Sequence, residues 1–213
     1  MIFDLKNFTI LATLVAWFFV AKKKEKWLPF VGVFLALSLA TELSAVWLRD
    51  NGYSNALVYN MFIPIDYVLS GLILSRVGPG KPRSMKVLLY ASPLFLLVAV
   101  IFLLSKSPLI WVASSVLLVS GLIVAIQSTV VLFTLAQMID IPIMKHPGFW
   151  IALSPFFFFT CFVPSFGLAM YFGDTNSDLA MKLYNIMDYF FFLRYSLILI
   201  GLGLLLKGRF NVE

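Results

Sequence analysis

Residues 57–76 read LVYNMFIPIDYVLSGLILSR, a stretch long and apolar enough to cross a bilayer that nevertheless contains a carboxylate. The carboxylate belongs to Asp66, and an asparagine, two tyrosines and a proline stand close to it in the chain. A charged side chain at the centre of a bilayer costs about 2.5–3.5 kcal/mol on insertion scales, so it normally faces the interior of a helix bundle. The stretch therefore predicts a membrane helix that turns Asp66 toward other helices.

The composition of the whole chain places it in the same environment. Of its 213 residues 62% are apolar and 12% are charged, whereas soluble domains average about 45–50% apolar and about 25% charged residues. The net charge of +6 comes from bases that flank apolar runs, which is typical of membrane topology and lipid headgroup contact, so we expect no nucleic-acid partner. One histidine and one cysteine are too few for the zinc sites of intramembrane hydrolases, so no metal is expected.

Seven apolar runs predict a single all-α integral membrane domain over residues 1–213, a seven-transmembrane helix bundle. Continuous apolar runs without alternation favour helices over barrel strands. The first run is short, so its helix either recruits Ile2–Asn7 or lets Lys22–Lys24 reach back to the interface. The predicted spans are Leu5–Ala21, Trp27–Leu48, Ala56–Leu74, Val87–Leu104, Leu109–Met138, Phe149–Phe172 and Leu183–Leu206.

Basic residues in alternate connections predict the orientation, because cytoplasmic loops carry the excess of lysine and arginine. We expect the N-terminus outside and the C-terminus in the cytoplasm, in a bacterial cytoplasmic membrane. The outer loops are predicted at Arg49–Asn55, Ser105–Pro108 and Gly173–Lys182. The bases assigned to the cytoplasmic side are Lys22, Lys23, Lys24, Lys26, Arg76, Lys81, Arg83, Lys86, Lys145, Lys207 and Arg209, and those assigned to the outer side are Lys6, Arg49, Lys106 and Lys182.

The third and seventh predicted spans share a pattern of polar residues. Tyr59-Asn60 precedes Asp66-Tyr67 in one, and Tyr184-Asn185 precedes Asp188-Tyr189 in the other. Both tyrosine-to-aspartate steps return to the same face of a helix. A parallel repeat of three, one and three helices would resemble the sugar transporters built from triple-helix repeats, although their paired proline–glutamine signature is missing. The alternative is a chance likeness between two aromatic-rich segments.

Four charged residues lie well inside the predicted spans, at Glu42, Asp66, Asp188 and Arg194. Counting 1.5 Å per residue places Asp66 and Arg194 near the midplane, with the other two about 10 Å from the outer surface, so Arg194 should pair with Asp66. Three acids against one base predict either a protonated acid or room for a cation. Interhelical hydrogen bonding is the structural alternative. The candidate ligand-binding or proton site comprises Glu42, Tyr59, Asn60, Asp66, Tyr67, Asn185, Asp188, Tyr189 and Arg194.

The length, topology and short loops, together with the Tyr-Asn pairs and the segment His146–Trp150 (HPGFW), resemble the seven-helix sensory modules of bacterial histidine kinases and their stand-alone relatives. The resemblance implies a module that senses a small molecule or lipid in an outward-facing polar cavity and signals through a partner protein. No retinal or other cofactor is expected, because Lys182 and Lys207 only bracket the seventh span. The alternatives are a small secondary transporter, with or without proton coupling, and a lipid-modifying enzyme using Glu42 or Asp66 as general acid or base, which no nucleophile–base pair supports.

Overall fold

The computed structural model describes residues 2–77, 98, 101, 105, 114–138, 142–173 and 175–208. Every regular element in these ranges is helical, so the expected all-α class is confirmed for the described part of the chain. The predicted fourth span, Val87–Leu104, lies outside the described residues except at Val98 and Ile101. The elements are α1 (Ile2–Val20), α2 (Leu28–Asp50), α3 (Ala56–Val77), α5 (Ser114–Met138), the 3-10 turn η1 (Ile143–Lys145), α6 (Pro147–Gly173) and α7 (Ser177–Leu206).

Five of the described helices, α2, α3, α5, α6 and α7, are long and apolar enough to cross a membrane. The apolar part of α1, Leu5–Val20, is shorter, as the short first run predicted. Large apolar side chains on α1 are nevertheless exposed, including Phe8, Phe18 and Phe19. An outward apolar surface suits a lipid environment. The chain is a multi-pass helical membrane protein.

The start of α7 differs from the prediction. The helix begins at Ser177 and not at Leu183, so the predicted outer loop Gly173–Lys182 is much shorter and Lys182 lies on the helix. The side chain of Asn176 accepts a hydrogen bond from the Leu179 backbone N–H at 3.1 Å, and Asp178 stands in the first turn. A capping side chain and an early carboxylate both stabilise a helix N-terminus, which explains why this polar stretch is helical.

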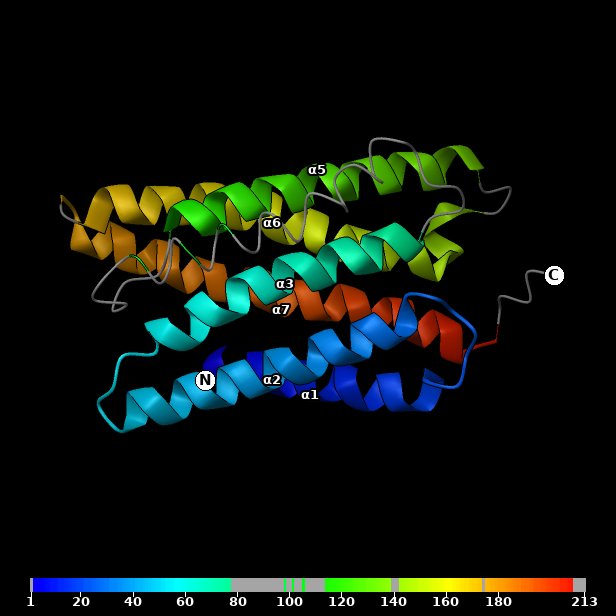
Figure 1. Ribbon diagram of the computed structural model, residues 1–213, viewed down its shortest axis with the longest axis horizontal. Helices are drawn as coiled ribbons and strands as arrows, with labels where there is room; N and C mark the ends of the chain where they lie inside the picture. Colours follow the sequence, from blue (N-terminus) through cyan, green and yellow to red (C-terminus); the bar gives the residue numbers. More distant parts are fainter. Residues whose placement is uncertain are drawn as a thin grey trace.

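The helices form a closed ring in chain order: each packs on the next described helix, and α7 returns to α1. Figure 1 shows α3 and α7 in the middle of the view, between the pair α1 and α2 and the pair α5 and α6. Trp17 joins α1 to α2, since its indole N–H donates to the Leu28 carbonyl at 2.8 Å and its ring fills the space beside Gly32, where a Cβ would collide. One turn earlier on α1 the Thr13 hydroxyl lies 3.3 Å from the Tyr195 carbonyl oxygen, which joins α1 to α7.

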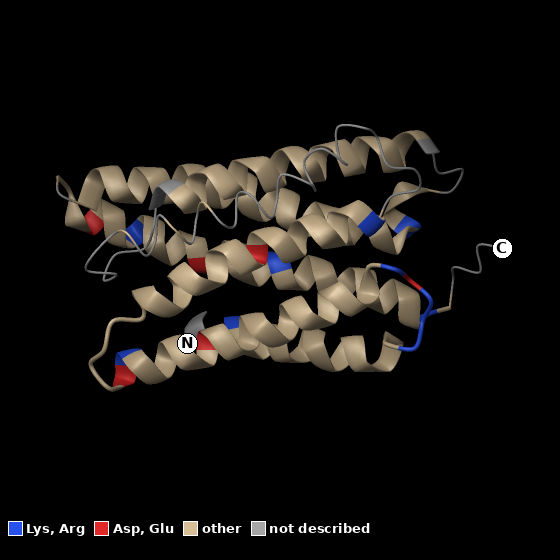
Figure 2. Cartoon of the chain, in the orientation of Figure 1, with Lys and Arg blue, Asp and Glu red and all other residues tan. Residues whose placement is uncertain are grey.

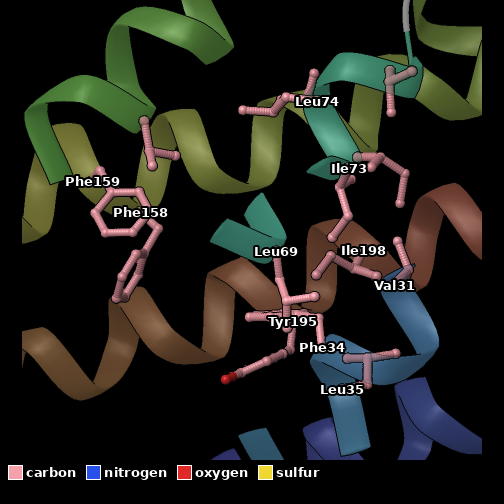
Figure 3. Packing of buried hydrophobic residues seen from close by; sticks show 14 of the residues in the cluster. Val31, Phe34, Leu35, Leu69, Ile73, Leu74, Phe158, Phe159, Tyr195 and Ile198 are labelled. Carbon is pink, nitrogen blue, oxygen red and sulfur yellow. The ribbon is translucent and has the colours of Figure 1, made fainter. Parts of the chain in front are cut away.

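Apolar residues from α2, α3 and α7 pack together in one half of the ring. In Figure 3 Val31 of α2, Ile73 of α3 and Ile198 of α7 point toward one another. Phe34 stacks on Tyr195 with ring centroids 6.1 Å apart. These residues come from the beginning of α2 and the ends of α3 and α7, and the same buried cluster continues into the other half of the ring with Phe158, Phe162 and Phe166 of α6.

Charge separates the two ends of the bundle (Figure 2). We call the end that carries the α1–α2 connection the basic end, and the end where α3 and α7 begin the opposite end. The opposite end carries Arg49, Asp50, Asp178 and Lys182, in which acids and bases balance. The described bases of the basic end are Lys22, Lys23, Lys24, Lys26, Arg76, Lys145 and Lys207, with Glu25 as the described acid among them.

Candidate functional site

Asp66 and Arg194 form a buried, two-pronged ion pair between α3 and α7. The two guanidinium nitrogens donate to the two carboxylate oxygens at 2.8 and 2.6 Å. The Ser70 hydroxyl donates to Asp66 Oδ1 at 2.9 Å and accepts from Arg194 Nη2 at 3.2 Å. The Arg194 side chain is only 2% exposed. The predicted pairing is confirmed, and it ties two helices together across the ring.

Aromatic rings enclose the Arg194 guanidinium. Its central carbon lies 4.5 Å from the ring centroid of Phe158, 4.7 Å from that of Phe34 and 5.2 Å from that of Phe159. A planar, weakly hydrated guanidinium is suited to this position, because it stacks on ring faces while its fork of N–H groups binds a carboxylate. Figure 3 shows Phe158 and Phe159 projecting from the same turn of α6. Arginine here therefore bonds to α3 and packs against α2 and α6.

A second buried ion pair was not predicted. Lys6, which the sequence analysis assigned to the outer side, lies in α1, is 5% exposed, and places Nζ 2.6 Å from Glu42 Oε2. The Tyr59 hydroxyl donates to the same oxygen at 3.3 Å. Among the described residues, the charges inside the bundle are thus three acids and two bases. The short first run was the signal for this, because a helix that recruits Ile2–Asn7 carries Lys6 into the bundle.

A cavity of about 300 Å³ lies beside both ion pairs, in the half of the ring nearer the opposite end. Its walls are largely aromatic, with Phe158, Phe162 and Phe166 stacked in series along α6 at centroid distances of 4.9 and 5.7 Å. Polar groups are concentrated on α2, α3 and α7. The polar and tyrosine lining consists of Ser38, Glu42, Tyr59, Asp66, Tyr67, Ser120, Tyr184, Asn185, Asp188 and Tyr195.

The structure brings most of the predicted site residues to this cavity. Those that line it are Glu42, Tyr59, Asp66, Tyr67, Asn185 and Asp188. Arg194 lies behind Asp66 and borders a separate cavity of about 20 Å³. Asn60 is buried away from the lining, and Tyr189 is 52% exposed on the outer face of α7.

The aromatic wall on α6 was missed by sequence reasoning. The run Pro155–Phe162 (PFFFFTCF) shows no inward face in the sequence, because consecutive phenylalanines hide any periodicity. The buried members, Phe158, Phe159, Phe162 and Phe166, recur at helical spacing. Ser38 and Ser120 were also missed, since single hydroxyl residues in apolar runs carry no distinctive pattern. Tyr184, which belongs to the polar pattern of the seventh predicted span, lines the cavity as well although it was not among the candidate site residues.

The site has the chemistry of a binding cavity. Within the described residues, no group of three histidine, cysteine, aspartate or glutamate side chains could hold a metal ion. Carboxylates, hydroxyls and an amide face aromatic rings, an arrangement that orients an amphiphilic molecule. No protein-family model, curated protein or solved structure matches this chain.

Proposed function

We propose that this protein is a membrane-embedded sensor or receptor-type module that binds a small molecule or lipid in the cavity among α2, α3, α5, α6 and α7. The cavity is the observation that carries the proposal. Ligand pockets typically have volumes of about 300–1,000 Å³, mostly apolar walls and a few convergent polar groups. This cavity lies at the lower end of that range, so the ligand is a small amphiphile or one end of a lipid.

The two ion pairs support a binding role because they border the cavity and connect separate helices. Glu42 and Asp66 both line the cavity, and each also forms an ion pair with a base that does not line it, Lys6 or Arg194. A ligand that contacts either carboxylate changes the strength of an ion pair between two helices. This change transmits the binding event to the rest of the bundle. The output passes to a partner protein, in line with the resemblance to sensory modules.

Filling the cavity tests the proposal. Ser120 lines it from α5 and is 3% exposed, so Ser120→Phe places a ring in the space. We expect phenylpropanol, a neutral aromatic amphiphile, to raise the thermal unfolding midpoint of the purified wild-type protein in detergent and to have no such effect on Ser120→Phe. Equal stabilisation of both proteins would contradict the proposal.

Thr160→Phe is the matched control, because Thr160 is exposed on the outer face of α6 and does not line the cavity. This variant adds a ring of the same size to the same membrane domain, outside the proposed site. It should respond to phenylpropanol as the wild type does. A loss of response in Thr160→Phe as well would mean that the probe acts through the detergent and not through the cavity.

We further propose that a helix at Val87–Leu104 completes a seven-span bundle with the N-terminus outside, in a bacterial cytoplasmic membrane. The excess of bases at the basic end supports this orientation. Single cysteines introduced in a Cys161→Ser background test it. A cysteine at Tyr53 should react with an impermeant thiol reagent in intact cells, and one at Lys23 should react only after the cells are broken; the reverse pattern would invert the topology.

Transport is the second candidate, favoured by the position of the cavity between charged residues deep in the bundle. Proteoliposome flux separates it from sensing. Saturable uptake that is lost in Asp66→Asn would identify a transporter, and binding without flux would identify a sensor. The lipid-modifying alternative has no nucleophile–base pair among the described cavity residues.

A further inference from the structure

Three carboxylates line the cavity, those of Glu42, Asp66 and Asp188, and no lysine, arginine or histidine among the described residues lines it with them. Lys6 forms an ion pair with Glu42, and Arg194 forms one with Asp66, with a nitrogen–oxygen distance of 2.6 Å in each pair. The surface that a ligand meets is therefore acidic, although the ion pairs neutralise most of the charge.

Asp188 carries the remaining charge. Within the described part of the chain, its carboxylate has no hydrogen bond and no ion pair, whereas Glu42 and Asp66 have both. It lies close enough to the Tyr59 hydroxyl for an electrostatic interaction. Among the described residues, two bases against three acids leave one net negative charge at the cavity, and the geometry assigns it to Asp188.

The cavity also opens beside Asp188. Asn185 and Tyr184, on the preceding turn of α7, line the cavity and are exposed, and Asp188 itself is partly exposed. A molecule entering from this side passes Asp188 first and meets the phenylalanine wall beyond it.

Aromatic walls favour a cation over a neutral or anionic ligand. Ring faces attract positive charge, and two rings of this cavity already do so: Phe191 lies 4.9 Å from Lys6 Nζ, and Phe158 lies 4.5 Å from the Arg194 guanidinium carbon. Phe62, Phe162 and Phe166 line the cavity as well. A bare metal ion finds no suitable ligand group among the described residues, so an organic cation fits best.

We propose that the cavity selects an amphiphilic organic cation, with its ammonium group at Asp188 and its apolar body against the α6 phenylalanines. This inference rests on the proposed function, because it names the ligand class of the same cavity. Phenylpropylamine, phenylpropanol and phenylpropionate test it as probes of closely similar shape that are positive, neutral and negative at neutral pH.

We expect the wild-type protein to bind phenylpropylamine roughly tenfold more tightly than phenylpropanol, since a partly screened ion pair contributes about that factor, and phenylpropionate most weakly. Asp188→Asn should reduce the affinity for the amine to that for the alcohol and leave the alcohol unchanged, which also shows that the variant is folded. Asp188→Glu should keep the preference for the amine.

Asp178→Asn is the matched control, because it removes the same charge from the same helix outside the cavity. It should keep the preference. If Asp178→Asn abolishes the preference as Asp188→Asn does, the charge of the whole end and not Asp188 selects the ligand, and the inference is overturned. If the alcohol and the amine bind wild type equally and Ser120→Phe blocks both, the inference fails while the proposed function stands. If none of the three probes binds, the proposed function itself fails.

Discussion

Two buried ion pairs hold the described part of this bundle, and they differ in geometry and in the chemistry of their bases. The Asp66–Arg194 pair has two parallel contacts, joins helices across the ring and is enclosed by aromatic rings. The Lys6–Glu42 pair has one short contact between neighbouring helices and shares its acceptor oxygen with Tyr59. A guanidinium cannot lose its proton in a protein, so Arg194 stays charged when its partner is removed. The first pair is therefore the less tolerant of losing its acid.

The largest expected effect comes from breaking the Asp66–Arg194 pair. Asp66→Ala and Arg194→Ala should each destabilise the protein by about 3–5 kcal/mol, because each leaves an uncompensated buried charge. The double variant should lose clearly less than the sum of the two. Thermal unfolding of the four proteins in detergent measures this cycle, and strict additivity would show that the two residues are not coupled.

Breaking the Lys6–Glu42 pair should cost less. Lys6→Met removes a hydrogen bond to a charged group, worth about 1.5–3 kcal/mol, but Glu42 keeps the hydrogen bond from the Tyr59 hydroxyl. Thermal unfolding midpoints of the wild-type protein and Lys6→Met in detergent check this. A penalty as large as that of Asp66→Ala would remove the distinction between the pairs.

Ser70 makes a smaller contribution to the stability of the Asp66–Arg194 pair. Ser70→Ala removes one hydrogen bond to Asp66 and one from Arg194 while leaving both charges paired, so we expect a loss of about 1 kcal/mol. Ser128→Ala is the control, because Ser128 is equally buried and bonds only to the Val124 carbonyl of its own helix. Equal midpoints for the two variants would mean that Ser70 adds nothing to the pair.

The smallest effect concerns a group far from both pairs. Burial lowers the pKa of His146 below its usual value of 6.5, and its Nδ1 accepts a hydrogen bond from the Gly148 N–H at 3.1 Å. The unfolded chain binds a proton on this residue before the folded protein does, so stability is lost as the pH falls below about 6.5. His146→Asn keeps an acceptor for Gly148 and should flatten that part of the stability curve; an unchanged acid slope would argue against His146 as its source.

The sequence was sufficient for the class of fold, for the Asp66–Arg194 pair and for the approximate bounds of the described helices other than the start of α7. Charged side chains inside a membrane pair with other charged side chains at the same depth, and few of these exist. Asp66 and Arg194 could therefore be paired by counting residues along the two helices. Lys6 was misplaced because a lysine near the start of a span is ordinarily interfacial, and only packing against α2 and α7 shows that it is buried. The cavity could not be predicted, since its wall depends on which phenylalanines of α6 turn inward.

The distance in sequence between paired charges also bears on how the chain enters the membrane. Lys6 and Glu42 lie on consecutive helices, so an inserting α2 meets its counter-ion at once. Asp66 and Arg194 are 128 residues apart, and α3 is therefore made long before α7 exists. During synthesis the phenylalanines of α6 follow α3 into the membrane first, and the guanidinium reaches Asp66 only when α7, the last described helix, arrives.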